Sequence, residues 1–263
     1  MKINGNEHLS SRRQSVLILF LVWVAGSVDA LSYLGLGKVF TANMTGNAVL
    51  LGISIAQGQM AAALRSLFAL VGFAVGVAVG TLIVKRKSSM IGWTPAVIAA
   101  LCVELAVLTC LMTAWHFLNS LRHEEVVLHL LIVFSATAMG IQTATVAHLR
   151  LPGIVTTYIT GTLATLVTGL VVFSKPGEGA SQDADTPITV GKGSESDGRW
   201  NQRVILQALV FLIYVCAAIF SGVLYERRPS FVSISPLIAL AIMLAGVFTL
   251  RRSKIQSGPE EKS

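Results

Sequence analysis

Two stretches of the sequence place threonine, asparagine and glycine together within apolar surroundings. The first reads Phe-Thr-Ala-Asn-Met-Thr-Gly-Asn at residues 40–47, and the second reads Thr-Thr-Tyr-Ile-Thr-Gly-Thr at residues 156–162. A helix that begins inside a membrane leaves up to four N–H groups unbonded and carries partial positive charge there. Threonine and asparagine can cap such an end, and glycine lets the backbone approach a ligand. The predicted substrate-binding residues are therefore Asn43, Thr45, Gly46, Asn47, Thr156, Thr160, Gly161 and Thr162.

A second interpretation of these Thr-Gly segments stays open. Small polar residues also let two membrane helices approach closely and hydrogen-bond to each other without binding a ligand. In transporters built from repeats, however, short Gly-interrupted segments at matching positions in both halves mark the substrate site. Gln142 joins the candidates, because it follows Gly140 at the place that Val28 occupies in the first apolar segment.

Two acidic residues lie inside apolar segments, where an ionisable group costs about 2.5–3.5 kcal/mol on insertion scales. Asp29 is in the first segment, and Glu104 is near the middle of the fourth. Each needs a partner or a water-filled cavity, so we predict that they couple transport to a proton or a cation. For Asp29 the alternative is a bond to a neighbouring helix near the outer interface. The depth of Glu104 makes that explanation weaker.

The elements that position these residues are predicted to be membrane helices. The 263-residue chain is 54% hydrophobic and 13% charged, which is about half the charged share of a typical soluble domain. Apolar runs long enough to cross about 30 Å of hydrocarbon must be helical, because lipid offers backbone amides no hydrogen bonds. The net charge of +7 comes from residues that flank these runs. It indicates topology and no nucleic-acid partner. The apolar segments are residues 15–36, 41–57, 62–84, 94–117, 126–148, 156–174, 203–225 and 234–251.

An internal repeat relates the two halves of the chain. When the two Thr-Gly pairs are aligned, Thr41 falls on Thr156, and upstream Gly26 corresponds to Gly140. We therefore predict an all-α membrane protein with six to eight hydrophobic helices in two pseudo-symmetric halves. The two short Thr-Gly helices in it are predicted to be broken or re-entrant.

The distribution of lysine and arginine favours six spans. If the Thr-Gly segments do not cross, 15 of the 20 basic residues are cytoplasmic, against 13 if all eight segments cross. Cytoplasmic loops are enriched in basic residues, and three spans per half would make the halves inverted, whereas eight spans would make them parallel. The predicted organisation is a cytoplasmic N-tail (1–14), a first membrane repeat (15–117), a linker (118–125), a second membrane repeat (126–251) containing a flexible polar loop (175–202), and a cytoplasmic C-tail (252–263).

Three glycines at a spacing of four, Gly72, Gly76 and Gly80, lie on one face of the third segment. This spacing is a close-packing signature in membrane helices. It either holds the two halves together or forms the interface of a homodimer.

Motifs of enzymes and cofactor sites are missing from the sequence. There is no P-loop, no Gly-x-Ser-x-Gly and no His-Glu-x-x-His. Cys102, Cys110 and Cys216 lie inside apolar runs without the spacing of a metal or redox site. An intramembrane hydrolase that uses Asp29 and Glu104 has no local motif behind it. We predict no enzyme activity, no cofactor and no metal; the expected partners are membrane lipids and a small-molecule or ion substrate.

The run Gly-Ser-Val-Asp-Ala-Leu-Ser-Tyr-Leu at residues 26–34, with the two Thr-Gly segments, resembles the YoaK-like family of bacterial integral membrane proteins, a domain of unknown function family. The resemblance covers roughly residues 15–251. It implies a multi-span fold in the bacterial inner membrane and supplies no substrate or catalytic residue. Together with the residue patterns, it leads us to predict a small secondary transporter or permease. The alternative is a non-transporting membrane scaffold or regulator.

Overall fold

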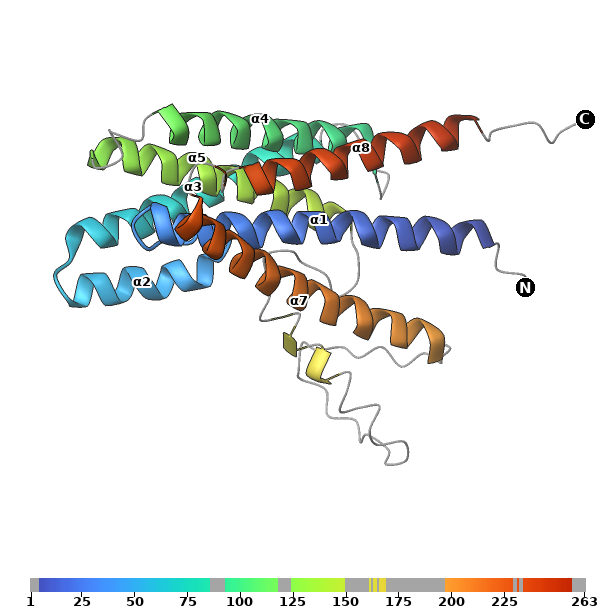
Figure 1. Ribbon diagram of the computed structural model, residues 1–263, viewed down its shortest axis with the longest axis horizontal. Coiled ribbons are helices and arrows are strands. Elements are labelled where there is room, and N and C mark those ends of the chain that lie inside the picture. The colour runs from blue at the N-terminus through green and yellow to red at the C-terminus, as the bar shows by residue number, and fades with distance from the viewer. Residues whose placement is uncertain are drawn as a thin grey trace, which may run out of the picture.

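A computed structural model describes residues 5–85, 93–117, 124–149, 161, 163–164, 166–168, 197–228, 231 and 234–256. In these ranges the regular secondary structure is entirely helical (Figure 1). The predicted all-α class is confirmed. The helices are α1 (Gly5–Gly35), α2 (Met44–Ala56), α3 (Met60–Lys85), α4 (Pro95–Phe117), α5 (Glu125–His148), α7 (Asp197–Arg227) and α8 (Ile234–Gln256).

Five of these helices, α1, α3, α4, α5 and α7, are long and apolar enough to cross a membrane, and α2 and α8 contribute shorter apolar stretches. The bounds agree with the predicted segments to within a few residues at most ends. The largest difference is at α1, which begins at Gly5, ten residues before the predicted start, and takes in most of the predicted N-tail. Helix α7 also begins early, at Asp197, and takes in the end of the stretch 175–202 that we predicted to be loop. An acidic residue in the first turn, here Asp197, favours a helix start. We missed this start because the residues around it are polar and resemble the loop that precedes them.

The long helices form a bundle with both chain termini at the same end (Figure 1). Helices α1, α4 and α7 run away from that end, and α3, α5 and α8 run back toward it. Helix α2 has 13 residues, or about 20 Å of helix, which is too short to cross about 30 Å of hydrocarbon. It packs on α3, to which a turn at Gly58 with φ 69° joins it.

The two halves of the sequence pack against each other through contacts between helices of opposite halves. The most extensive contact joins α3 of the first half to α5 of the second, and the next joins α1 to α7. The packing of α1 on α8 is matched by the packing of α5 on α4. Glycines allow the closest approaches: a Cβ on Gly76 would overlap the Thr137 carbonyl, and one on Gly72 would lie 2.7 Å from the Val133 carbonyl oxygen. The glycine row of α3 thus faces α5 within the chain.

The interior of the bundle and its outer surface are both apolar. Fully buried side chains include Ile18 of α1, Leu101 of α4 and Met139 of α5. Large apolar side chains such as Leu82 and Phe134 are exposed on the outside. Helices that are apolar all round are typical of membrane spans.

Candidate functional site

The first Thr-Gly segment forms a break between α1 and α2. The chain leaves α1 at Gly35 and turns through Gly37 and Lys38, whose φ angles are 79° and 67°. Glycine adopts this left-handed conformation freely, whereas lysine does so only with strain. Asn43 then caps α2: its Oδ1 accepts a hydrogen bond from the Gly46 N–H at 3.2 Å. This cap satisfies the Gly46 N–H only. The backbone N–H groups of residues 41–43, which precede α2, need another acceptor.

Asp29 supplies that acceptor from α1. Its Oδ1 accepts the backbone N–H groups of Thr41 at 2.8 Å, Ala42 at 2.7 Å and Asn43 at 3.4 Å. Its Oδ2 accepts the hydroxyl of Tyr214, from α7, at 2.6 Å. We call this set the Asp29 network. A negative group at a helix N-terminus is favoured by the unbonded amides and the helix dipole. The anion position at the start of α2 is therefore filled by a carboxylate of the chain itself.

Asn47 closes the break from the other side. Its Oδ1 accepts the Phe40 N–H at 2.9 Å, and its Nδ2 donates to the Phe40 carbonyl at 2.6 Å. The side chain is fully buried, so its amide provides the pairing that the non-helical backbone lacks. Of the other two predicted residues in this segment, Thr45 is exposed, and Gly46 is half-buried against the Phe40 ring.

A chain of hydroxyl groups ties the break to α5. Ser32 donates to the Val28 carbonyl at 2.7 Å, so its one hydrogen is used and the 2.9 Å contact to Thr41 is donated by Thr41. Ser135 of α5 donates to the same Thr41 oxygen at 3.1 Å. The Thr41 side chain thus joins α1, the break and α5.

A pocket of about 290 Å³ opens beside the Asp29 network, between α1 and α7. Its walls are largely apolar, and the lining residues with polar side chains are Asp29, Tyr33 and Tyr214. Tyr33 stacks on Phe40 with ring centroids 5.1 Å apart, and the Lys38 ammonium lies 4.8 Å from the Tyr33 centroid. The lining residues are Gly26, Asp29, Ala30, Tyr33, Leu34, Phe40, Tyr214 and Ala218.

Gln142 and Glu104 lie outside this network. The Gln142 Nε2 donates to the Leu21 carbonyl of α1 at 2.9 Å, so this side chain links α5 to α1. Glu104 is fully buried, and neither of its carboxyl oxygens has a hydrogen-bond partner among the described residues. The structure therefore separates the two buried acids, one at the break and one in the middle of α4.

Of the second Thr-Gly segment, Thr156, Thr160 and Thr162 lie outside the described residues, and Gly161 is helical and exposed. Sequence reasoning missed Tyr214, Ser32 and Ser135. A usable signal existed for Tyr214, because a tyrosine in an apolar span needs a partner for its hydroxyl. The two serines gave no comparable signal, since small polar residues are common in membrane helices.

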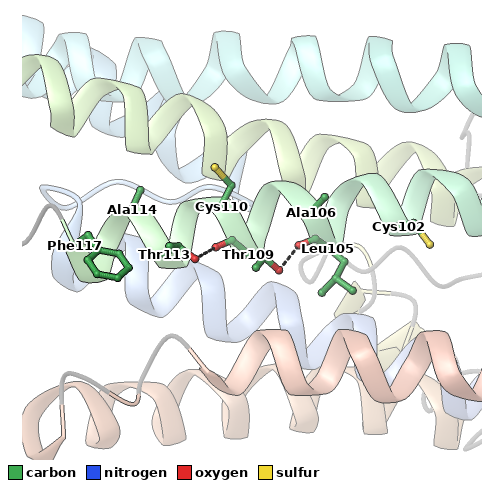
Figure 2. A pocket seen from close by; sticks show the side chains of 8 residues that line it. All are labelled: Cys102, Leu105, Ala106, Thr109, Cys110, Thr113, Ala114 and Phe117. Carbon is green, nitrogen blue, oxygen red and sulfur yellow. Dashed lines mark hydrogen bonds between the residues drawn. The ribbon is translucent and has the colours of Figure 1, made fainter.

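Two larger grooves lie on the outer surface of the bundle. One, of about 830 Å³, follows α4, and Figure 2 shows its lining. The Thr109 and Thr113 hydroxyls there donate to the Leu105 and Thr109 carbonyls of the same helix at 2.7 Å, which leaves an apolar surface. The other, of about 700 Å³, lies between α1, α7 and α8 and is lined largely by apolar side chains. Neither groove contains a residue predicted to bind substrate.

Comparison with known proteins agrees with this architecture. The family described as "Protein of unknown function (DUF1275)" matches residues 17–250. The UPF0700 transmembrane protein YoaK of Bacillus subtilis (strain 168) is 40% identical over 168 residues, which are 62% of this chain and 71% of YoaK. No solved structure matches the chain. With its apolar helices, the protein is an integral membrane protein whose outward-facing side chains contact lipid.

Proposed function

The chain belongs to the DUF1275 family of YoaK-like membrane proteins, and on that premise we propose that it is a small secondary transporter or permease of the inner membrane. The observation that carries the proposal is a broken helix inside the bundle with a pocket beside it. A break in an intramembrane helix leaves backbone groups unbonded, and it is tolerated only where protein groups or a water-filled cavity satisfy them. Here Asp29 and Asn47 perform that task.

The pocket between α1 and α7 gives the proposed substrate a size limit. A volume of about 290 Å³ is near the lower end of small-molecule sites, which favours a small solute. The backbone amides of the break between α1 and α2 are already bonded to Asp29. In the aligned sequence Thr143 stands where the first half has Asp29. Substrate contacts by Thr156, Thr160, Gly161 and Thr162 stay a separate prediction, because the described lining of the pocket includes none of these residues.

An inverted repeat is part of the proposal. It is supported by the aligned Thr-Gly segments and by the matching helix pairs, α3 with α5 and α7 with α1. Corresponding helices also run in opposite directions, as α1 and α5 do (Figure 1). Repeats related in this way place the substrate site between them and allow alternating access by rocking of one repeat against the other.

Cysteine labelling tests the topology. In a background without the three exposed native cysteines, we expect Arg227→Cys to react with a membrane-impermeant maleimide from outside the cell. Arg86→Cys should be protected until the membrane is opened. Labelling of both positions from outside would contradict the six-span arrangement with cytoplasmic termini.

A ligand screen with reconstituted protein tests the permease proposal. A bound solute stabilises the folded state by RT ln(1 + [L]/Kd), about 2.7 kcal/mol at one hundred times Kd, so a thermal-shift screen finds candidates for uptake assays. Ala218→Leu fills the pocket without removing a hydrogen bond, and we expect it to abolish binding and uptake. Ala106→Leu, in the groove along α4, is the matched control and should leave both unchanged.

A non-transporting scaffold is the second candidate function. It is favoured by the complete bonding of the first break, in which the Asp29 and Asn47 side chains are all engaged within the chain. If no solute shifts the melting temperature, and Ala218→Leu leaves every cellular phenotype intact, the scaffold replaces the permease. Neither the permease nor the scaffold needs a catalytic residue, and we assign none.

A further inference from the structure

Glu104 is an acidic residue buried at a position where packing alone would need only an apolar side chain. It lies in the middle of α4 and is fully buried. Within the described part of the chain, both carboxyl oxygens lack a hydrogen-bond partner and no residue forms an ion pair with them. Buried polar side chains in folded proteins are nearly always hydrogen-bonded, so each exception needs an explanation.

The burial determines the charge of the group in this conformation. Moving an unpaired carboxylate from water into an apolar interior costs far more than a folded protein can offset, and such a group takes up a proton instead. Even the neutral carboxyl loses hydrogen bonds to water, at about 1–3 kcal/mol for an unsatisfied group. An alanine or leucine at this position would avoid that cost entirely. Glu104 is therefore protonated in this conformation, and its unsatisfied carboxyl lowers the stability of the fold.

No charged group on the neighbouring helices is placed to change this. Helix α4 packs on α5, α8 and α3, whose titratable residues lie toward the helix ends. At one end Glu125 contacts Arg65 at 3.4 Å and His129 at 3.6 Å. Glu104 is about 14 Å along α4 from Pro95 at the helix rise of 1.5 Å per residue. The titratable residues of these three helices are Arg65 and Lys85 of α3, Glu125, His129 and His148 of α5, and Arg251, Arg252 and Lys254 of α8.

We propose that Glu104 is the proton-binding group of the protein: it holds H⁺ in the packed conformation and releases it when α4 separates from its neighbours. The proposal rests on the permease function and adds the coupling ion to it. In the transfer, the carboxyl O–H bond breaks, the proton passes to water on one side, and a proton from the other side restores the acid. One H⁺ thus crosses per cycle, with no other reactant.

A metal cation fits this position poorly. Hard cations take several oxygen ligands, and none of the described residues brings a second carboxylate to Glu104. No group of three or more histidine, cysteine, aspartate or glutamate residues occurs among the described residues. Asp29 is a poorer proton carrier than Glu104, because four donors hold its two oxygens. Taking up a proton at Asp29 would also weaken the hydrogen bonds that hold the start of α2.

Infrared difference spectroscopy in proteoliposomes tests the proposal without a known substrate. As the pH is raised, we expect the carbonyl stretch of a protonated carboxyl to disappear in the wild-type protein. The part of that band that persists above the pH range in which exposed carboxyls titrate should be absent in Glu104→Gln, which keeps the shape of the side chain and removes the acid. Glu125→Gln, at a partly exposed surface acid, should retain it. A hydrophobic carbodiimide should modify Glu104 at low pH and leave Asp29 unmodified.

The outcomes separate this proposal from the permease function. Loss of the band in Glu104→Gln supports the proton site even if no solute is transported, and in that case only the permease fails. Uptake that is independent of a pH gradient and unchanged in Glu104→Gln overturns the proton site and leaves the permease standing. An identical titration in the wild type and Glu104→Gln also overturns it. If Glu104→Gln does not assemble, Glu104→Met provides the same comparison.

Discussion

The two buried acids of this protein lie in contrasting surroundings. Around Asp29, three backbone N–H groups and the Tyr214 hydroxyl converge on the carboxylate. Around Glu104, no donor from the residues that the structure describes reaches either oxygen. Both side chains are almost completely removed from solvent, at 3% and 0% exposure. The depth of an acid within the bundle therefore does not distinguish a structural carboxylate from a proton carrier.

The backbone near each acid makes the difference. Asp29 faces a break, where residues before Met44 have N–H groups that no helix turn satisfies. Glu104 lies within α4, whose described neighbours α5, α8 and α3 are regular helices with amides already bonded to their own carbonyls. An acid beside a break is stabilised as an anion, and an acid among intact helices stays neutral. Substitutions at the two positions should consequently have opposite effects on stability.

The largest effect is expected for Asp29→Ala. The substitution leaves three N–H groups and one hydroxyl without an acceptor, and each buried unsatisfied group costs about 1–3 kcal/mol. Allowing for some relaxation, we expect a loss of about 3–5 kcal/mol, comparable to breaking a buried ion pair. Denaturant titration of the protein in mixed micelles measures it. A loss below about 1 kcal/mol would show that the break does not depend on Asp29.

Asn47→Ala should come next, with a loss of about 2–3 kcal/mol, because it leaves the N–H and the carbonyl of Phe40 unpaired. Asn43→Ala is the matched control. It removes a part-buried N-cap worth about 1 kcal/mol. Equal losses in the two variants would contradict the special role of Asn47, and the same denaturant titration compares them.

Tyr214→Phe removes one hydrogen bond from the Asp29 network and keeps the ring. A hydrogen bond to a charged group contributes about 1.5–3 kcal/mol, and we expect a loss near the lower end of that range. A double-mutant cycle with Asp29→Asn isolates the coupling between the two side chains. A coupling energy near zero would mean that α7 packs on α1 independently of Asp29.

Glu104→Gln should have the smallest effect, within about 0.5 kcal/mol of the wild type, since the carboxyl has no partner to lose. Glu104→Met should be neutral or stabilising, as replacing buried polar groups by apolar ones of similar volume often is. A marked destabilisation in both variants would indicate a hydrogen-bonded partner and remove the contrast with Asp29. Thermal unfolding of the purified variants provides the measurement.

Much of the helix arrangement was predictable because lipid forces apolar runs into helices, and hydropathy is a local signal. The ends of α4 and α5 were predicted to within one residue. The sequence also identified Asp29, Asn43 and Asn47 as unusual. It assigned Asp29 to coupling and the two asparagines to substrate binding, however, and the structure shows that Asp29 bonds to the Asn43 backbone. That contact depends on the turn through Gly37 and Lys38, which no hydropathy pattern encodes.

The long sequence separation between Asp29 and Tyr214 has a consequence for biosynthesis. The two residues are 185 positions apart, and ribosomes add roughly 5–20 residues per second. Helix α1 therefore waits roughly 10–40 s in the bilayer before α7 emerges to complete its contacts. During that interval the nascent amino-terminal half has an unpaired interface, so an insertase or chaperone that shields α1 should raise the yield of correctly assembled protein.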